Sequence, residues 1–254
     1  MYCLITVSAG SKNQAKNILS VLSVCSNDYK EWVREIMNKK KLISFDLDST
    51  LIDPTYNTFV WEIGIPQLYA KKNDVNLSKA KSIVIGEYQR VGDASLEWYD
   101  IAYWFRFFEL PGSWQDLMEE HRDKVRLFPE VKAVMEDLAQ SHDLIIISNA
   151  AREFVEIETK ETEIANYFAR TFSTTSDLGQ VKKTPECYEE ILGIVGTKPS
   201  DSIHVGDHYE FDYLIPKRLG MEAYYLDRDG NKPKDHYTIK DLTEFANLVK
   251  APPR

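Results

Sequence analysis

Short apolar runs that alternate with amphipathic stretches limit this chain to a small set of folds. Four runs rich in β-branched and aromatic residues lead into polar residues at their carboxyl ends: LISFDL (42–47), LIIISN (144–149), SIHVGD (202–207) and EAYYLD (222–227). Such runs are typical of strands that are buried on both faces of a parallel sheet. A further short strand is predicted in RTFSTTSD (170–177).

Amphipathic patterns with helical periodicity lie between and after these strands, at 129–140, 151–169, 185–195 and 241–250. Strands that alternate with helices indicate a parallel sheet that carries helices on both faces. The sequence therefore predicts an α/β core with a doubly wound parallel sheet.

Residues 55–127, which we call the helical insert, break this alternation. They contain no strand-like run, and aromatic residues recur on two faces of a helical pattern around 98–108. A helix that is apolar on two faces is expected to be buried. We predict a mostly helical subdomain inserted after the first strand, with most of these rings in its core. A few rings are candidates for facing a substrate, and the sequence does not say which.

The first 36 residues do not connect to this pattern, whereas Met37 begins a stretch that leads directly into the first strand. The predicted organisation is an N-terminal extension of unclear role at 1–36, an α/β core at 37–54 and 128–254, and the helical insert at 55–127. No internal repeat or low-complexity tract interrupts it.

Composition and charge exclude several classes of partner. The 254 residues carry a formal net charge of −9, whereas general nucleic-acid binding requires a basic surface. The sequence contains no run of about 18 or more apolar residues, the length that a membrane span needs. The N-terminal stretch lacks the basic region of a signal peptide. Three cysteines without metal-ligand spacing suit a reducing compartment. We expect a cytoplasmic monomer or homodimer that binds neither nucleic acid nor membrane.

Two aspartates follow the first strand. Asp46 and Asp48 stand in FDLDSTLID (45–53), and side chains two residues apart on a strand point to the same side. Two crowded and desolvated carboxylates repel each other, and a hard divalent cation offsets that repulsion. The alternative is a solvated Asp-rich turn, which the buried strand before the pair and Thr50 and Leu51 after it disfavour.

Other strand ends carry matching groups. Ser148 and Asn149 follow the second run, where a hydroxyl and an amide are able to hold a phosphoryl oxygen, although such a pair is also an ordinary helix cap. Gly206 and Asp207 end the third run, with Asp212 five residues on, and the carboxylates suit a cation site rich in oxygen. Ligands of open parallel sheets bind beyond the carboxyl ends of the strands, where these groups fall.

Taken in order, these groups resemble the motifs of the haloacid dehalogenase (HAD) superfamily of hydrolases. The resemblance covers residues 42 to about 228 and rests on DLDST (46–50), IIISN (145–149), a lysine at 182 or 183, and GDHYEFD (206–212). It implies a Rossmann-like α/β core with a helical cap in the place of the helical insert. A cap of this kind closes over the site, excludes water and selects the substrate.

The resemblance also implies a role for each residue. Asp46 matches the nucleophile that forms an aspartyl-phosphate, and Asp48 matches the general acid and base. The other implied roles are substrate binding by Thr50, Ser148 and Asn149, Mg²⁺ binding by Asp46, the backbone carbonyl of Asp48 and Asp207, and support from Gly206 and Asp212.

The third motif leaves its lysine open. The family often writes it Lys-Pro-x-Pro-x-x-Phe, whereas KKTPECY (182–188) has Lys183 in place of the first proline. Counting back from Pro185 and Tyr188 favours Lys182 as the cation that neutralises the phosphoryl oxygens and the nucleophile. The lost proline leaves the backbone freer, so Lys183 stays an alternative.

Asp48 distinguishes branches of the superfamily. Haloacid dehalogenases proper lack this second aspartate, because a departing halide needs no proton. Its presence predicts a Mg²⁺-dependent phosphatase that hydrolyses a small phosphorylated metabolite. The alternatives are a phosphotransferase or phosphomutase, a dehalogenase, and a non-catalytic binding protein on the same fold.

Overall fold

The computed structural model describes residues 41–231 and 237–251. The predictions made for residues 1–36 and for a core that begins at Met37 lie outside the described residues. The described residues belong to one compact unit that begins at Lys41. None of their helices has the length and apolar character that crossing a membrane requires.

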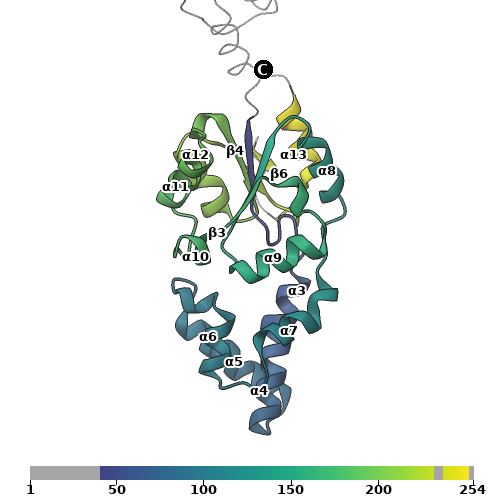
Figure 1. Ribbon diagram of the computed structural model, residues 1–254, viewed down its shortest axis with the longest axis vertical. Coiled ribbons are helices and arrows are strands. Elements are labelled where there is room, and N and C mark those ends of the chain that lie inside the picture. Colours follow the sequence, from purple (N-terminus) through teal and green to yellow (C-terminus); the bar gives the residue numbers. More distant parts are fainter. Residues whose placement is uncertain (1–40, 232–236, 252–254) are drawn as a thin grey trace, which may run out of the picture. The chain divides into compact units, whose positions relative to one another are not determined.

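Six parallel strands form the central sheet (Figure 1). They lie in the order β3-β2-β1-β4-β5-β6, and every pair of neighbours is parallel. Their bounds are β1 Leu42–Phe45, β2 Asp143–Ser148, β3 Arg170–Ser173, β4 Ser202–Gly206, β5 Glu222–Leu226 and β6 Thr238–Ile239. The five predicted strands are confirmed. Strand β6 was not predicted, because a two-residue edge strand leaves no apolar run in the sequence.

Helices cover both faces of the sheet, which confirms the doubly wound arrangement. Their bounds are α8 Val131–Leu138, α9 Arg152–Glu161, α10 Thr174–Asp177, α11 Pro185–Val195, α12 Ile215–Arg218 and α13 Leu242–Lys250, with short turns η4 Ala165–Tyr167, η5 Pro199–Asp201 and η6 Tyr209–Leu214. Successive side chains of a strand point to opposite faces. Accordingly, Ile146 packs in the core with α8 and α13, and Ile147 packs in the core with α11 and α12.

Helix α11 shows how local sequence sets the ends of these elements. The Thr184 hydroxyl accepts a hydrogen bond from the Cys187 backbone N–H, and Pro185 occupies the first turn. Gly196 ends the helix with a φ of 70°, a left-handed conformation that glycine adopts without strain. The helix therefore begins at Pro185, with Thr184 as its cap between it and Lys183.

Helices also form the stretch between β1 and β2, as the sequence predicts. Their bounds are α3 Thr55–Thr58, η1 Phe59–Gly64, α4 Ile65–Asn73, α5 Leu77–Val91, η2 Leu96–Trp98, α6 Ile101–Phe107, α7 Trp114–His121 and η3 Arg122–Lys124. The chain leaves and re-enters the core at adjacent points, because Ile52 pairs with Leu127 in an antiparallel bridge.

The aromatic residues of α6 differ from the expectation of two buried faces. Trp104 is fully buried and Phe105 nearly so. Phe107, on the second face, is 40% exposed, and Tyr103 is half-buried. Only one face of this helix therefore packs in the core of the helical insert.

Strand β1 lies at the point where the direction of winding reverses. Its neighbours are β2 on one side and β4 on the other, and the connections from them lead away in opposite directions. In open α/β sheets this position leaves a crevice beyond the carboxyl ends of the strands. Asp46 follows β1 directly, so the predicted motif stands at that crevice.

Candidate active site

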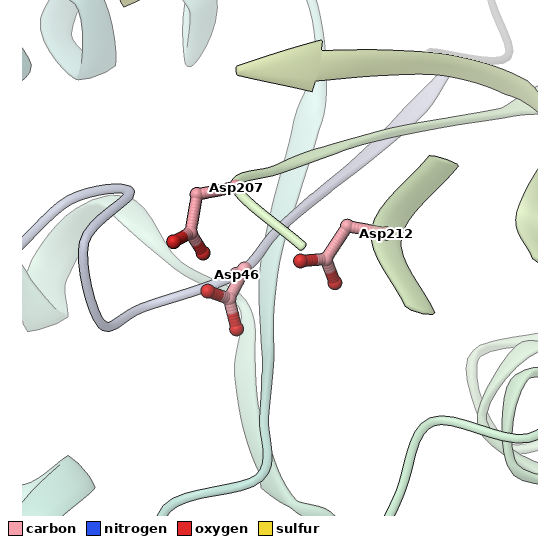
Figure 2. Close-up of side chains that lie close together, drawn as sticks. All are labelled: Asp46, Asp207 and Asp212. Atoms are coloured by element: carbon pink, nitrogen blue, oxygen red, sulfur yellow. The ribbon is translucent and has the colours of Figure 1, made fainter. Parts of the chain in front are cut away.

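Three carboxylates meet beyond the carboxyl ends of β1 and β4. Figure 2 shows Asp46, Asp207 and Asp212 turned toward one another, and one oxygen from each lies within 4.8 Å of the others. Asp46 follows β1, Asp207 follows β4, and Asp212 lies in η6. The structure thus brings together the groups that the sequence places at separate strand ends.

Lys183, not Lys182, enters this cluster. Its Nζ contacts Asp46 Oδ1 and lies 2.6 Å from Asp212 Oδ1, and its side chain is 2% exposed. Lys182 instead pairs with Asp93 of the helical insert at 3.5 Å. The preference for Lys182 was therefore wrong.

The backbone explains this outcome. The Thr184 N–H bonds the Lys182 carbonyl (2.9 Å), which makes a tight three-residue turn centred on Lys183. Counting residues back from helix α11 does not reveal which way a side chain points out of such a turn.

The electrostatics of the cluster keep Lys183 charged. Burial by itself would lower its pKa, but the charges of Asp212 and Asp46 hold that pKa above its usual value. For the carboxyl group of Asp46, burial has the opposite effect and raises the pKa, and the charge of Lys183 opposes this rise. For Asp212, Lys183 and the hydrogen bond from His204 outweigh burial, so its pKa falls below its usual value.

Asp212 is fixed by groups on β4 and its following loop. His204 Nε2 lies 3.1 Å from Asp212 Oδ1, and the His208 backbone N–H donates to Oδ2 (2.9 Å). Burial lowers the pKa of His204, and a carboxylate only accepts, so the neutral ring carries its proton on Nε2. Its Nδ1 then accepts from the Ser44 hydroxyl (2.7 Å). Gly206 completes the arrangement, because a Cβ at this position would overlap the Asp212 carboxyl group.

Asp48 is held by Asn57, which also contacts Glu158; neither residue belongs to a motif identified in the sequence. The Asn57 side-chain amide donates to Asp48 Oδ1 and to Glu158 Oε1 (3.2 Å), so it bridges the two acids. Burial, and next the charge of Asp46, raise the pKa of Asp48 to about 7. Burial, and next the charge of Asp48, raise the pKa of Glu158 well above its usual value.

Of these two residues near Asp48, Glu158 left a signal in the sequence and Asn57 did not. Glu158 stands four residues after the buried Phe154, on the apolar face of α9, where an acid is out of place. His204 was detectable in the same way, as a polar residue inside an apolar strand run. Asn57 carries no such mark, since its role depends on how α3 is placed beside the core.

The groups assigned to phosphate binding lie around Asp46 and Asp48. Ser148 Oγ accepts from the Ala150 N–H (3.0 Å) and also hydrogen-bonds Asp48. Asn149 Oδ1 accepts from the Thr174 hydroxyl (3.0 Å). Thr50 differs from the expectation, because its fully buried hydroxyl donates to Asp46 Oδ2 (3.4 Å). It therefore orients that carboxylate instead of facing a ligand.

Arg228 secures the turn that follows Asp48. Its guanidinium donates to the carbonyls of Ser49 (3.2 Å) and Thr50 (2.7 Å) and pairs with Glu130 at 2.8 Å. Ser49 has a φ of 60°, a strained conformation for a residue with a side chain. These contacts stabilise the turn, and no motif in the sequence pointed to Arg228.

A cavity of about 410 Å³ opens beside Asp48. Its walls come from the core and from the helical insert: Asp48, Asn57, Trp61, Glu62, Ile85, Tyr88, Gln89, Trp98, Tyr99, Asn149, Ala150, Ala151 and Phe154. The volume suits a small ligand. The sequence did not indicate which aromatic rings near α6 face a substrate. In the structure, Trp98 and Tyr99 line this cavity.

The carboxylates fit a hard cation such as Mg²⁺. Burial, and next the charge of Asp46, raise the pKa of Asp207 to about 8, so these two groups repel each other when both are ionised. An oxygen-seeking cation between them would offset that repulsion. Asp212 has both oxygens engaged by Lys183, His204 and the His208 N–H, so it supports the site from outside.

Comparison with known proteins agrees with this geometry. The family described as haloacid dehalogenase-like hydrolase matches residues 40–220. Haloacid dehalogenase-like hydrolase domain-containing protein 3 of Danio rerio is 40% identical over 78 residues, which are 28% of this chain and 32% of the relative. This chain therefore spans about a third of that protein.

A longer match links the chain to pyrophosphatase PpaX of Bacillus cereus. The two are 25% identical over 178 residues, 67% of this chain and 76% of the relative. Among solved structures, a HAD phosphatase from Thermococcus onnurineus matches with a TM-score of 0.72 at 23% identity, over 83% of this chain and 98% of that one. The structural match shows a shared fold.

Proposed function

The chain belongs to the haloacid dehalogenase-like hydrolase family, and we propose that it is a Mg²⁺-dependent phosphatase of a small phosphorylated metabolite with Asp46 as its nucleophile. The contact of buried Lys183 with both Asp46 and Asp212 carries this proposal. A fixed ammonium beside a carboxylate nucleophile suits attack on an anionic phosphoryl group. The relative named a pyrophosphatase supports phosphoryl chemistry as well.

Asp46 and Asp48 have separate roles in the reaction. An oxygen of Asp46 attacks phosphorus, the bond between phosphorus and the ester oxygen breaks, and Asp48 gives its proton to the departing alkoxide. Asp48, now ionised, takes a proton from a water molecule whose oxygen attacks the aspartyl-phosphate, which releases Asp46 and phosphate. A pKa raised to about 7 suits a group that must be protonated in one step and ionised in the next.

Positive charge at the site has two sources. Asp46, the backbone carbonyl of Asp48 and Asp207 would hold Mg²⁺, which when bound supplies charge that offsets repulsion between the nucleophile and the phosphate. Lys183 supplies the charge that comes from the protein itself, and Asp212 keeps its ammonium in place. Ser148 and Asn149 bind the phosphoryl oxygens.

Removal of divalent metal should abolish turnover of p-nitrophenyl phosphate, and added Mg²⁺ should restore it. The same addition should raise the thermal midpoint, because the cation relieves repulsion between Asp46 and Asp207. Asp207→Asn should remove that thermal shift, which provides the control. Full turnover after metal removal has been verified by elemental analysis would rule out the proposed cofactor.

Asn57→Ala should lower kcat/KM for an alkyl phosphate roughly 10- to 100-fold, because Asp48 loses the bridge that orients it. The loss should be smaller for p-nitrophenyl phosphate, whose leaving group needs no proton. Steady-state kinetics with both esters measure the difference. Asn73→Ala, at an exposed position of α4, is the matched control. An equal loss on both esters would show that Asn57 acts on something other than proton transfer.

Other activities of the family separate by simple product analysis. A dehalogenase has no use for the proton of Asp48, so the hydrogen-bonded placement of that residue favours ester hydrolysis. A phosphotransferase would move phosphate to an added alcohol, whereas a phosphatase releases inorganic phosphate from every turnover. A non-catalytic binding protein would show no Mg²⁺-dependent turnover that Asp46→Asn removes.

The proposed setting is the cytoplasm, with a small metabolite as partner and with neither nucleic acid nor membrane. The buried thiol of Cys187 is free, as suits a reducing compartment. Monomer and homodimer are both compatible with this setting.

A further inference from the structure

The cavity beside Asp48 has an aromatic wall. Trp61 and Phe154 stack with ring centroids 5.4 Å apart, and Tyr88 meets Trp61 edge-on at 5.9 Å. The Tyr88 hydroxyl donates to the Trp61 carbonyl (3.2 Å), which fixes the ring and leaves its apolar surface toward the cavity. Trp98 packs against Tyr88 at 6.2 Å and extends the wall. This wall is a preformed surface for a flat group.

The same cavity lacks positive charge. Its acidic lining residues are Asp48 and Glu62, and its described lining includes no lysine, arginine or histidine. The two nearby lysines form ion pairs with other residues, Lys183 with Asp46 and Lys182 with Asp93. A second anion on the leaving group would therefore lose its hydration without gaining a cation.

We infer that the substrate is a phosphate monoester whose leaving alcohol carries a flat, uncharged aromatic or heteroaromatic ring and no second anionic group. The inference rests on the proposed function, since it takes the phosphate to lie at Asp46 and the alcohol to lie beside Asp48. Packing of the ring against half-buried Trp61, which Phe154 supports from behind, selects for the substrate, and Glu62 selects against pyrophosphate and phosphorylated carboxylic acids.

Three phosphate esters of primary alcohols test this selection, because the bond that breaks is of the same type in each. Benzyl phosphate should exceed both 4-carboxybenzyl phosphate and n-butyl phosphate in kcat/KM by about tenfold or more. Comparable or faster turnover of 4-carboxybenzyl phosphate, or of pyrophosphate, would overturn the inference.

Variants assign the selection to particular residues. Trp61→Leu should reduce the preference for benzyl over n-butyl phosphate by several-fold, because the flat contact surface is lost. Glu62→Lys should raise kcat/KM for 4-carboxybenzyl phosphate relative to benzyl phosphate. Phe107→Leu changes an aromatic residue of the same helical insert that does not line the cavity, so both ratios should stay as in the unaltered protein. Ratios that respond equally to all three variants would overturn the assignment.

A binding measurement separates this inference from the proposed function. Benzylphosphonate and its 4-carboxy analogue cannot be hydrolysed at the carbon–phosphorus bond, and tryptophan fluorescence from Trp61 and Trp98 reports their binding in the presence of Mg²⁺. Tighter binding of benzylphosphonate than of its 4-carboxy analogue, without turnover of any ester, would support the selection of a flat, uncharged ring and refute the phosphatase activity. Turnover of p-nitrophenyl phosphate with no preference for benzylphosphonate would refute the inference and leave the activity standing.

Discussion

Asp46→Asn should lower kcat/KM for phosphate monoesters by roughly four orders of magnitude or more, because a side-chain amide is a poor nucleophile. Replacement also removes one negative charge from the carboxylate cluster, so the protein should stay folded. Asp143→Asn, an exposed aspartate at the amino end of β2, makes the same chemical change at the opposite edge of the sheet and should leave turnover within about twofold.

A covalent intermediate gives an independent readout of the same prediction. Rapid acid quench followed by intact-protein mass should detect a phosphorylated fraction in the unaltered protein and none in Asp46→Asn. Near-normal, Mg²⁺-dependent turnover by Asp46→Asn would show that another group attacks phosphorus, and the assignment of Asp46 would fail.

Lys183→Met should lower kcat/KM by about 10²- to 10³-fold, as expected when a preorganised charge at the transition state is removed. It should also destabilise the protein by about 3–5 kcal/mol when no metal is bound, because Asp46 and Asp212 lose the ammonium that pairs with both. Mg²⁺ should recover part of the thermal midpoint without recovering the rate.

Lys182→Met provides the matched control one residue away. Lys182 pairs with a largely exposed Asp93, and such surface ion pairs contribute about 0–1 kcal/mol. Its kcat/KM should stay within about threefold of the unaltered protein. Lys183→Arg, which keeps the charge, extends the test if Lys183→Met does not fold. A larger loss in Lys182→Met than in either Lys183 variant would reverse the assignment.

The sequence predicted the strand ends because each combines two signals, an apolar run and a polar residue directly after it. Apolar runs identify strands that both faces of a sheet cover, and a polar residue directly after such a run must lie at the edge of the sheet. Asp46 and Asp207 were found in this way, and their convergence followed from parallel strands whose carboxyl ends share one edge. The two-residue strand β6 left no such run and was missed.

The choice between Lys182 and Lys183 shows where spacing stops being informative. Both residues precede the same helix, and the direction of each side chain depends on a backbone turn that brings the Thr184 N–H to the Lys182 carbonyl. Residue counting from Pro185 carried no information on that turn. The buried acids beyond the turn, and not the local sequence, make the Lys183 position favourable for a cation.

The sequence by itself determined the α/β core, the order of its motifs and the carboxylates at its strand ends, since these depend on periodicity and on residues adjacent in the chain. Only the tertiary structure decided which lysine enters the site, that Asn57 joins Asp48 to Glu158, and which aromatic rings form the cavity wall. The physical reason is that these contacts join elements far apart in the chain. The Asn57 bridge and the cavity wall also depend on how the helical insert packs beside the core, which no local pattern encodes.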